Sequence, residues 1–194
     1  MCKICVEIIC GMYYNKNNRG NIMEQLSEIW KIMDTNEYNI VWNKIYDDFC
    51  FKPNYKGDTF YFKMPFDTYD ISETTLMQDD GKSNELMILT FIECMEKDPF
   101  MYVLDWQHSC YYYNPRIKQN KENPTFIIDE KYQDGGYNAY FPEFYPNGDY
   151  YFFIAKDFRW GYFTHPWKMN VWVFGDKLMG KIKNNSNILN FKKI

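Results

Sequence analysis

The stretch Pro146-Asn-Gly-Asp-Tyr-Tyr-Phe-Phe-Ile-Ala155 decides the fold class of this 194-residue chain. Its beginning, Pro146-Asn-Gly-Asp149, is typical of a tight turn, which also accounts for Asp149. The following segment, Tyr150–Ala155, is apolar at odd and even positions alike. A strand that is apolar on both faces is typical of the interior of a sheet covered on both sides. We therefore expect Tyr150–Ala155 to be a central strand, with Phe152 and Phe153 buried on opposite faces.

Further strands are predicted on both sides of this segment. The turn at Pro146–Asp149 predicts a hairpin between Tyr137–Phe141 and Tyr150–Ala155. Residues 59–63 predict another strand, and residues 67–71 an irregular or edge segment. The remaining candidate strands have an apolar period of two and are Met101–Trp106, Cys110–Tyr113, Trp160–Thr164 and Asn170–Phe174.

Apolar residues at helical spacing predict helices mainly before this run of strands. A short helix is expected over 23–33 and a clearer amphipathic helix over 38–49. A third helix begins with Ser83 or Asn84 as the N-cap and ends before Pro99. A terminal helix over 176–183 is followed by a polar tail.

These elements predict an α+β fold in which N-terminal helices pack on a mainly antiparallel sheet. We expect a single domain over residues 23–194. Residues 1–22 end in a polar run and are predicted to be a poorly structured N-terminal extension.

Composition excludes several classes of protein. The chain carries 22 Lys plus Arg and 26 Asp plus Glu, a net charge of −4, so it lacks the basic balance of a nucleic-acid-binding protein. Its aromatic content of 21% excludes intrinsic disorder. No apolar run is long enough to predict a membrane-spanning helix. We therefore expect neither nucleic acid nor a membrane as a partner, and the oligomeric state stays open.

The six cysteines favour a reducing compartment, because the N-terminus does not resemble a secretory signal. This predicts a cytoplasmic location. Cys2, Cys5 and Cys10 lack the fourth ligand of a structural zinc site, so we expect no metal and no cofactor. Cys110 is interpreted as a small buried hydrophobic residue rather than a nucleophile.

The chain contains two histidines, His108 and His165. If the fold brings both together with Asp105 or Asp157, they form a two-histidine, one-carboxylate site suited to metal or acid–base chemistry. Asp105 and His108 converge only if a tight turn separates them. The alternative, which we favour, is that each imidazole is satisfied by local hydrogen bonds and fixes a corner of the sheet.

Several tryptophans are candidates to line a groove for a ligand or partner. We expect Trp172 to belong to the core and Trp167 to be an exposed anchor. The candidate binding residues are Trp106, His108, Tyr111, Trp160, His165 and Trp167.

Five short motifs point to a known family. They are Leu104-Asp-Trp-Gln-His108, Pro146-x-Gly-Asp-Tyr-Tyr151, Asp157-Phe-x-Trp-Gly161, His165-Pro-Trp167 and Val173-Phe-Gly175. With them the chain resembles, from about residue 42 to about residue 178, the bacterial family known as domain of unknown function 2716. The resemblance implies a cytoplasmic bacterial protein with one α+β domain, and it implies no reaction.

Two functions remain open. The favoured one is a non-catalytic binding module with a protein partner, immunity-like or regulatory, because acidic surfaces bearing tryptophan suit basic partners. The alternative is an enzyme that uses His108 and His165 with a carboxylate for metal-dependent or acid–base hydrolysis. Whether the two imidazoles lie close together distinguishes these hypotheses.

Overall fold

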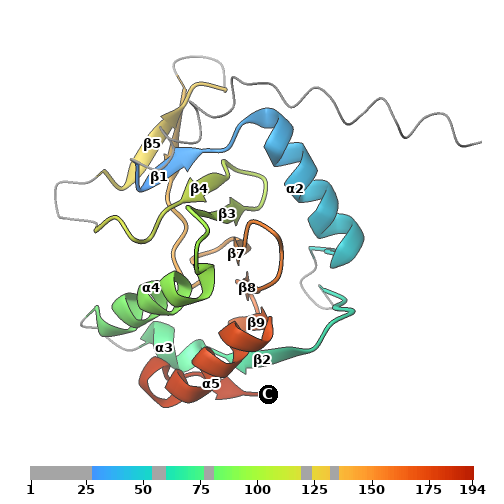
Figure 1. Cartoon of the computed structure of the whole chain (residues 1–194), viewed down its shortest axis with the longest axis vertical. Helices are drawn as coiled ribbons and strands as arrows, with labels where there is room; N and C mark the ends of the chain where they lie inside the picture. The colour runs from blue at the N-terminus through green and yellow to red at the C-terminus, as the bar shows by residue number, and fades with distance from the viewer. Residues whose placement is uncertain (1–27, 54–59, 77–80, 119–123, 132–135) are drawn as a thin grey trace, which may run out of the picture.

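The computed structural model describes residues 28–53, 60–76, 81–118, 124–131 and 136–194, and the predicted extension over 1–22 lies outside these ranges. The main feature is an eight-stranded sheet in which all neighbouring strands are antiparallel (Figure 1). The strands follow in the spatial order β1 (Trp30–Ile32), β4 (Tyr111–Tyr113), β3 (Met101–Asp105), β7 (Tyr151–Ile154), β8 (Gly161–His165), β9 (Asn170–Phe174), β2 (Phe66–Asp70) and β10 (Lys192–Lys193).

A separate two-stranded hairpin is formed by β5 (Phe126–Asp129) and β6 (Tyr137–Tyr140). The helices are α2 (Thr35–Asp48), α3 (Ser72–Leu76), α4 (Lys82–Met95) and α5 (Asp176–Leu189). The α+β class and the antiparallel sheet are confirmed. The helices are not all N-terminal, however, because α4 lies between strands and α5 follows β9.

Helices cover both faces of the sheet, which divides the core in two (Figure 1). One face, here called the α4 face, packs against α4 and α5 through residues such as Phe91 and Leu178. The other, the α2 face, packs against α2 through Trp42. Phe152 lies in the core of the α2 face and Phe153 in that of the α4 face, and both are fully buried. The central position predicted for this strand is therefore confirmed, since β7 pairs with β3 and β8.

Helix α2 shows how local sequence sets an element that covers the sheet. The Asp34 side chain accepts a hydrogen bond from the backbone N–H of Glu37 at 2.9 Å, which caps the helix start. One stripe of the helix, with Val41, Trp42 and Ile45, is buried against the sheet. The helix predicted over 38–49 is thus confirmed.

The secondary structure predicted for three segments is wrong. The helix expected over 23–33 includes Trp30–Ile32, which is instead strand β1, because these residues pair with β4. Of the strand expected over 59–63, the described residues 60–63 form none. Residues 67–71 were expected to be irregular or an edge segment, but β2 is a regular strand that pairs with β9 along its length and with β10 at Tyr69 and Asp70.

The predicted hairpin around the 146–149 turn is also wrong. Strand β6 pairs with β5, whereas both sides of β7 are occupied by β3 and β8. The polar tail predicted after residue 183 is in fact helical to Leu189, and the buried side chain of Leu189 holds this end against the core. None of the described helices is both long and apolar enough to cross a bilayer.

Candidate functional site

The first cluster of ionisable side chains forms where β3 turns into β4. Asp105 ends β3 in phase with Val103, so its side chain lies on the α4 face. The backbone N–H of His108 donates to the carbonyl of Asp105 at 3.2 Å, and Gln107 has a left-handed φ of 68°. This is the tight turn that the two residues need in order to converge, and His108 Nδ1 lies 3.1 Å from Asp105 Oδ1.

A second carboxylate joins this pair from the 146–150 turn. Asp149 Oδ2 lies 3.6 Å from His108 Nδ1. The ring of Tyr137 lies parallel to the imidazole of His108, with ring centroids 6.2 Å apart. Asp149 was interpreted from sequence as a turn residue only. No sequence signal places its turn beside the one that carries His108.

Burial changes the chemistry of Asp105. Its side chain is nearly covered, and this burial raises the pKa of the carboxyl to about 7, with a smaller rise from the charge of Asp149 and an opposing effect of His108. One ligand atom each of Asp105, His108 and Asp149 lie within 4.8 Å of one another. The three side chains could therefore hold a metal ion.

The second histidine lies on the other face of the sheet. His165 ends β8 in phase with Phe163, and its ring contacts those of Tyr150 and Trp172 at centroid distances of 4.9 and 5.7 Å. These neighbours belong to the α2 face. His165 is fully buried, and its Nδ1 accepts a hydrogen bond from the backbone N–H of Lys168 at 3.2 Å. The structure therefore does not bring His108 and His165 together.

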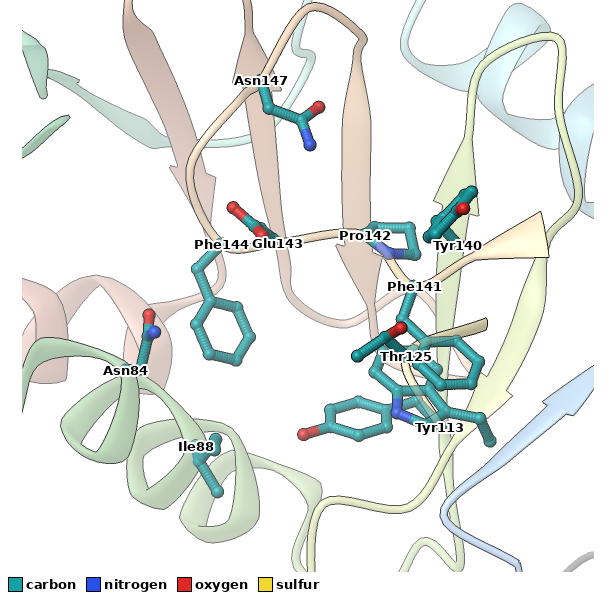
Figure 2. A pocket seen from close by; sticks show the side chains of 11 residues that line it. Asn84, Ile88, Tyr113, Thr125, Tyr140, Phe141, Pro142, Glu143, Phe144 and Asn147 are labelled. Carbon is teal, nitrogen blue, oxygen red and sulfur yellow. The ribbon is translucent and has the colours of Figure 1, made fainter. Parts of the chain in front are cut away.

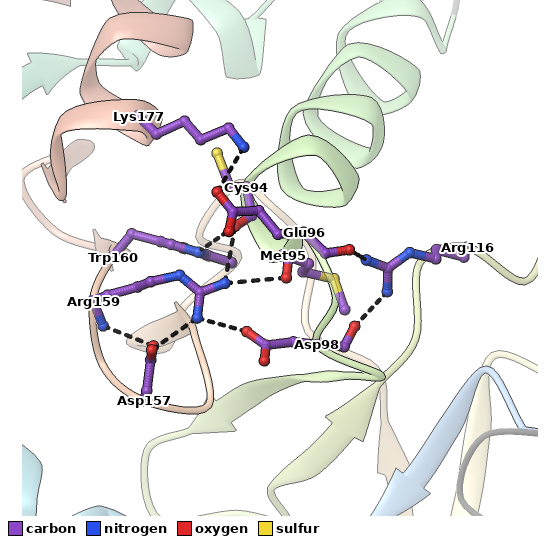
Figure 3. A network of polar contacts seen from close by, with 9 residues as sticks. All are labelled: Cys94, Met95, Glu96, Asp98, Arg116, Asp157, Arg159, Trp160 and Lys177. Atoms are coloured by element: carbon purple, nitrogen blue, oxygen red, sulfur yellow. Dashed lines mark hydrogen bonds and ion pairs between the residues drawn. The ribbon is translucent and has the colours of Figure 1, made fainter.

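Asp157 is distant from this cluster because it lies beyond the opposite end of β7. Asp105 pairs with Tyr151 at the start of β7, whereas Asp157 lies in the turn beyond Ile154, the last residue of that strand. Its carboxylate binds Arg159 at 2.8 Å and thereby orients the guanidinium (Figure 3). Partial burial raises the pKa of Asp157, but the hydrogen bonds and the charge of Arg159 outweigh this effect and lower it.

Arg159 and Trp160 together cap the end of α4 (Figure 3). Arg159 donates to the carbonyls of Cys94 and Met95 at 3.2 and 3.1 Å, and Trp160 Nε1 donates to the carbonyl of Cys94 at 3.0 Å. Carbonyls in the last turn of a helix lack intrahelical partners and favour a cation nearby. Asp157 and Trp160 therefore have a structural role here.

The other predicted binding residues are divided between the two faces. On the α2 face, Trp106 and Trp167 pack edge-on against Tyr150, and Trp167 is half-exposed as expected. On the α4 face, Tyr111 is buried and its hydroxyl donates to the carbonyl of Tyr140 at 2.9 Å. Cys110 is buried, and burial raises the pKa of its thiol to about 12, so it is not prepared to act as a nucleophile.

A pocket of about 490 Å³ opens beside the ionisable cluster, between α4 and the segment 140–147. Figure 2 shows Asn84 and Ile88 on α4 facing this segment across the pocket. The lining is mainly aromatic and apolar and consists of Trp30, Ile88, Tyr113, Tyr140, Phe141, Pro142 and Phe144. Four further residues, Asn84, Thr125, Glu143 and Asn147, add polar groups.

The aromatic wall of the pocket is a three-ring stack. Trp30 lies between Tyr113 and Phe141, with centroid distances of 3.9 and 4.6 Å and interplanar angles of 17° and 6°. The Trp30 indole N–H is buried and has no hydrogen-bond partner among the described residues. Sequence reasoning missed this site because it placed Trp30 in a helix.

The pocket and the surroundings of the ionisable cluster share two elements. The turn 146–150 supplies Asn147 to the pocket and Asp149 to the cluster. Strand β6 supplies Tyr140 to the pocket and Tyr137, whose ring lies parallel to the His108 imidazole. A hydrogen bond from the Tyr151 hydroxyl to Asn147 holds this turn against β7. A ligand in the pocket would therefore contact the elements that position Asp149.

Comparison with known proteins gives a family but no activity. The sequence profile of a family described as "Protein of unknown function (DUF2716)" matches residues 32–179. The chain is 27% identical over 169 residues to "Uncharacterized protein YxiI" of Bacillus subtilis (strain 168), an alignment that covers 82% of this chain and 96% of that protein. No solved structure matches the chain significantly.

Proposed function

Because the chain belongs to this family of proteins of unknown function, DUF2716, we propose its role from the site alone: it is a non-catalytic binding domain whose pocket takes an aromatic ring. The observation that carries this proposal is the Tyr113–Trp30–Phe141 stack with its unpaired indole N–H. The ring belongs to a small molecule or to the side chain of a partner protein. In the second case the domain has a regulatory or immunity-like role.

The dimensions and chemistry of the pocket suit such a ligand. Ligand pockets typically enclose about 300–1,000 Å³ and have apolar walls with a few polar groups. An aromatic wall favours a flat ring through offset or edge-to-face packing, which contributes about 0.5–1.5 kcal/mol beyond area burial. A buried donor without a partner costs about 1–3 kcal/mol. The Trp30 nitrogen has almost no accessible surface, so an acceptor on the ligand reaches it only when the neighbouring lining shifts. Such a contact would recover that free energy, and we therefore expect the ring to carry an acceptor atom.

Binding without catalysis is supported by what lines the pocket. Among its described lining residues, Glu143 is the one acid, and none is a histidine, cysteine or serine. The hydroxyl of Thr125 therefore has no histidine beside it in this lining to act as its base. The two-histidine enzyme is also disfavoured, because His108 and His165 lie on opposite faces of the sheet.

A matched pair of substitutions on α4 tests the proposal. Ile88 lines the pocket, whereas its neighbour Leu89 is 51% exposed and does not. We expect the neutral fluorescent probe N-phenyl-1-naphthylamine to bind the wild-type protein with a stoichiometry of one. Ile88→Trp should narrow the pocket and weaken binding, while Leu89→Trp adds the same side chain outside it and should leave binding unchanged.

Two results contradict the proposal. One is that the wild type does not bind the probe, and the other is that Ile88→Trp and Leu89→Trp bind it equally. The source of the natural ring is then identified by native mass spectrometry of the purified protein. A retained small molecule supports a free ligand. A peptide library displaying Phe, Tyr and Trp tests for a partner's side chain.

A further inference from the structure

The three side chains that meet beside the pocket have a chemistry that ligand binding in the pocket does not use. Asp105 and His108 come from the β3–β4 turn and Asp149 from the turn before β7. We propose that Asp105, His108 and Asp149 bind a divalent first-row transition metal ion through two carboxylate oxygens and one imidazole nitrogen. This proposal stands independently of the proposed function.

The spacing of the three ligand atoms matches a coordination shell. Metal–nitrogen and metal–oxygen bonds of about 2.0–2.2 Å in a tetrahedral arrangement place neighbouring ligand atoms about 3.4 Å apart. His108 Nδ1 lies 3.1 Å from Asp105 Oδ1 and 3.6 Å from Asp149 Oδ2. These two separations match the expected spacing, and the Asp105 and Asp149 ligand oxygens lie within 4.8 Å of each other, so an ion would draw the two carboxylates together.

The two neighbouring carboxylates of the cluster also favour a cation between them. Asp105 is about nine-tenths buried and lies close to a second carboxylate. Among the described residues, His108 is the one group that forms an ion pair with Asp105 or Asp149, and no lysine or arginine does so. Buried carboxylates are normally paired with a cation or coordinate a metal. A divalent ion between the two carboxylates would supply positive charge to both of them and complete the site.

The ligand set and its exposure define the class of ion. One nitrogen with two oxygens suits manganese, iron or zinc, whereas calcium and magnesium prefer oxygen ligands alone. The side chains of His108 and Asp149 are 38% and 36% exposed, so an ion can enter from solvent. Three protein ligands leave at least one position for water or for an external ligand. The parallel ring of Tyr137 restrains the orientation of the His108 imidazole.

Manganese is the suitable probe, because thiolates prefer softer ions and the cysteines of the chain would compete for zinc. Binding of MnCl₂ to the full chain is followed by the loss of the free-ion signal in electron paramagnetic resonance. We expect one bound ion with modulation from a single ¹⁴N nucleus, the signature of one imidazole ligand. Magnesium should bind at least tenfold more weakly.

Three variants test the ligand assignment. Asp149→Asn should weaken manganese binding at least about tenfold, since disturbing even an outer-shell partner has that effect. His108→Gln should remove the ¹⁴N modulation. Asp47→Asn removes an equal charge from an exposed position on α2 and should bind as the wild type does. Asp149 is partly exposed, so its substitution preserves the fold, which circular dichroism verifies.

Several outcomes overturn the proposal. These are no manganese binding in the millimolar range, a bound ion without ¹⁴N modulation, or equal affinity of Asp149→Asn and Asp47→Asn. Loss of manganese binding in both Asp variants alike would indicate attraction by net charge, and it would also overturn the site. None of these results depends on whether the aromatic pocket binds its ligand.

Discussion

Replacement of Asp105 by asparagine should change how the stability of the protein depends on pH. Burial raises the pKa of Asp105 from 3.8 to about 7 in the folded state. In the unfolded chain the carboxyl loses its proton near its ordinary pKa. Between about pH 4 and about pH 7 the folded state therefore holds the proton that the unfolded state has lost, and the wild type loses stability as pH rises through this window. Below the window both states are protonated, and above it both are ionised.

The size of the effect follows from the same shift. At about 1.4 kcal/mol per pKa unit, it corresponds to at most about 4 kcal/mol across the window. Asparagine does not ionise, so the free energy of unfolding of Asp105→Asn minus that of the wild type should rise by about 2–4 kcal/mol from about pH 4 to about pH 8. Taking this difference cancels the contributions of titrating groups that lie far from Asp105.

Urea unfolding followed by circular dichroism measures this difference, with EDTA present so that no bound ion contributes. The Asp47→Asn variant is the matched control, because it removes a carboxyl from an exposed position. A difference between Asp105→Asn and the wild type that stays constant with pH, or that falls as pH rises, would refute the reasoning. It would show that Asp105 ionises as readily in the folded state as in the unfolded chain.

Three further substitutions test the packing. Phe153→Ala should lower the free energy of unfolding by about 3–5 kcal/mol, measured by urea denaturation, because the ring is fully buried in the α4-face core; a loss below about 1 kcal/mol would contradict that burial. Gly161→Ala should cost about 1–3 kcal/mol, because the added Cβ would lie 2.5 Å from the Phe174 ring, and an unchanged melting temperature would contradict this. His165→Ala should cost about 1–3 kcal/mol by leaving the Lys168 N–H without its acceptor, and a variant as stable as the wild type would argue against a structural role.

The centre of the fold could be predicted because its signal is local and strong. Tyr150–Ala155 is apolar on both faces, and a strand with that composition has few alternatives to a central position in a sheet. Helix α2 was predictable for a similar reason, since apolar residues repeat at helical spacing from Tyr38 to Phe49. These features depend on the residues of one segment alone.

Strand pairing could not be predicted in the same way. The 146–149 turn correctly indicates a chain reversal, but it does not determine which strands become neighbours. Strand β6 pairs with β5, a strand absent from the sequence analysis. Strand β1 is only Trp30–Ile32, which is too short to distinguish a period of two from helical spacing.

The candidate site combines predicted and missed residues for a related reason. Asp105 and His108 lie close together in sequence, so their contact could be named in advance as conditional on one tight turn, which the structure contains. Asp149 comes from a turn some forty residues away, and only the packing of the two turns brings it to His108. The separation of His108 and His165 depends on which sheet face each occupies. That in turn depends on the register of β3 and β8 with β7.

The indole N–H resonance of Trp30 tests the proposed binding function most directly. The chain has six tryptophans, so a ¹H–¹⁵N spectrum shows six indole signals, and Trp30→Phe identifies the relevant one. Quinoline carries an acceptor nitrogen in a flat ring system, and naphthalene has the same shape without the acceptor. We expect quinoline to shift the Trp30 signal downfield through a new hydrogen bond, while the signal of the exposed Trp167 stays in place. An unmoved Trp30 signal, or equal shifts with quinoline and naphthalene, would contradict the account.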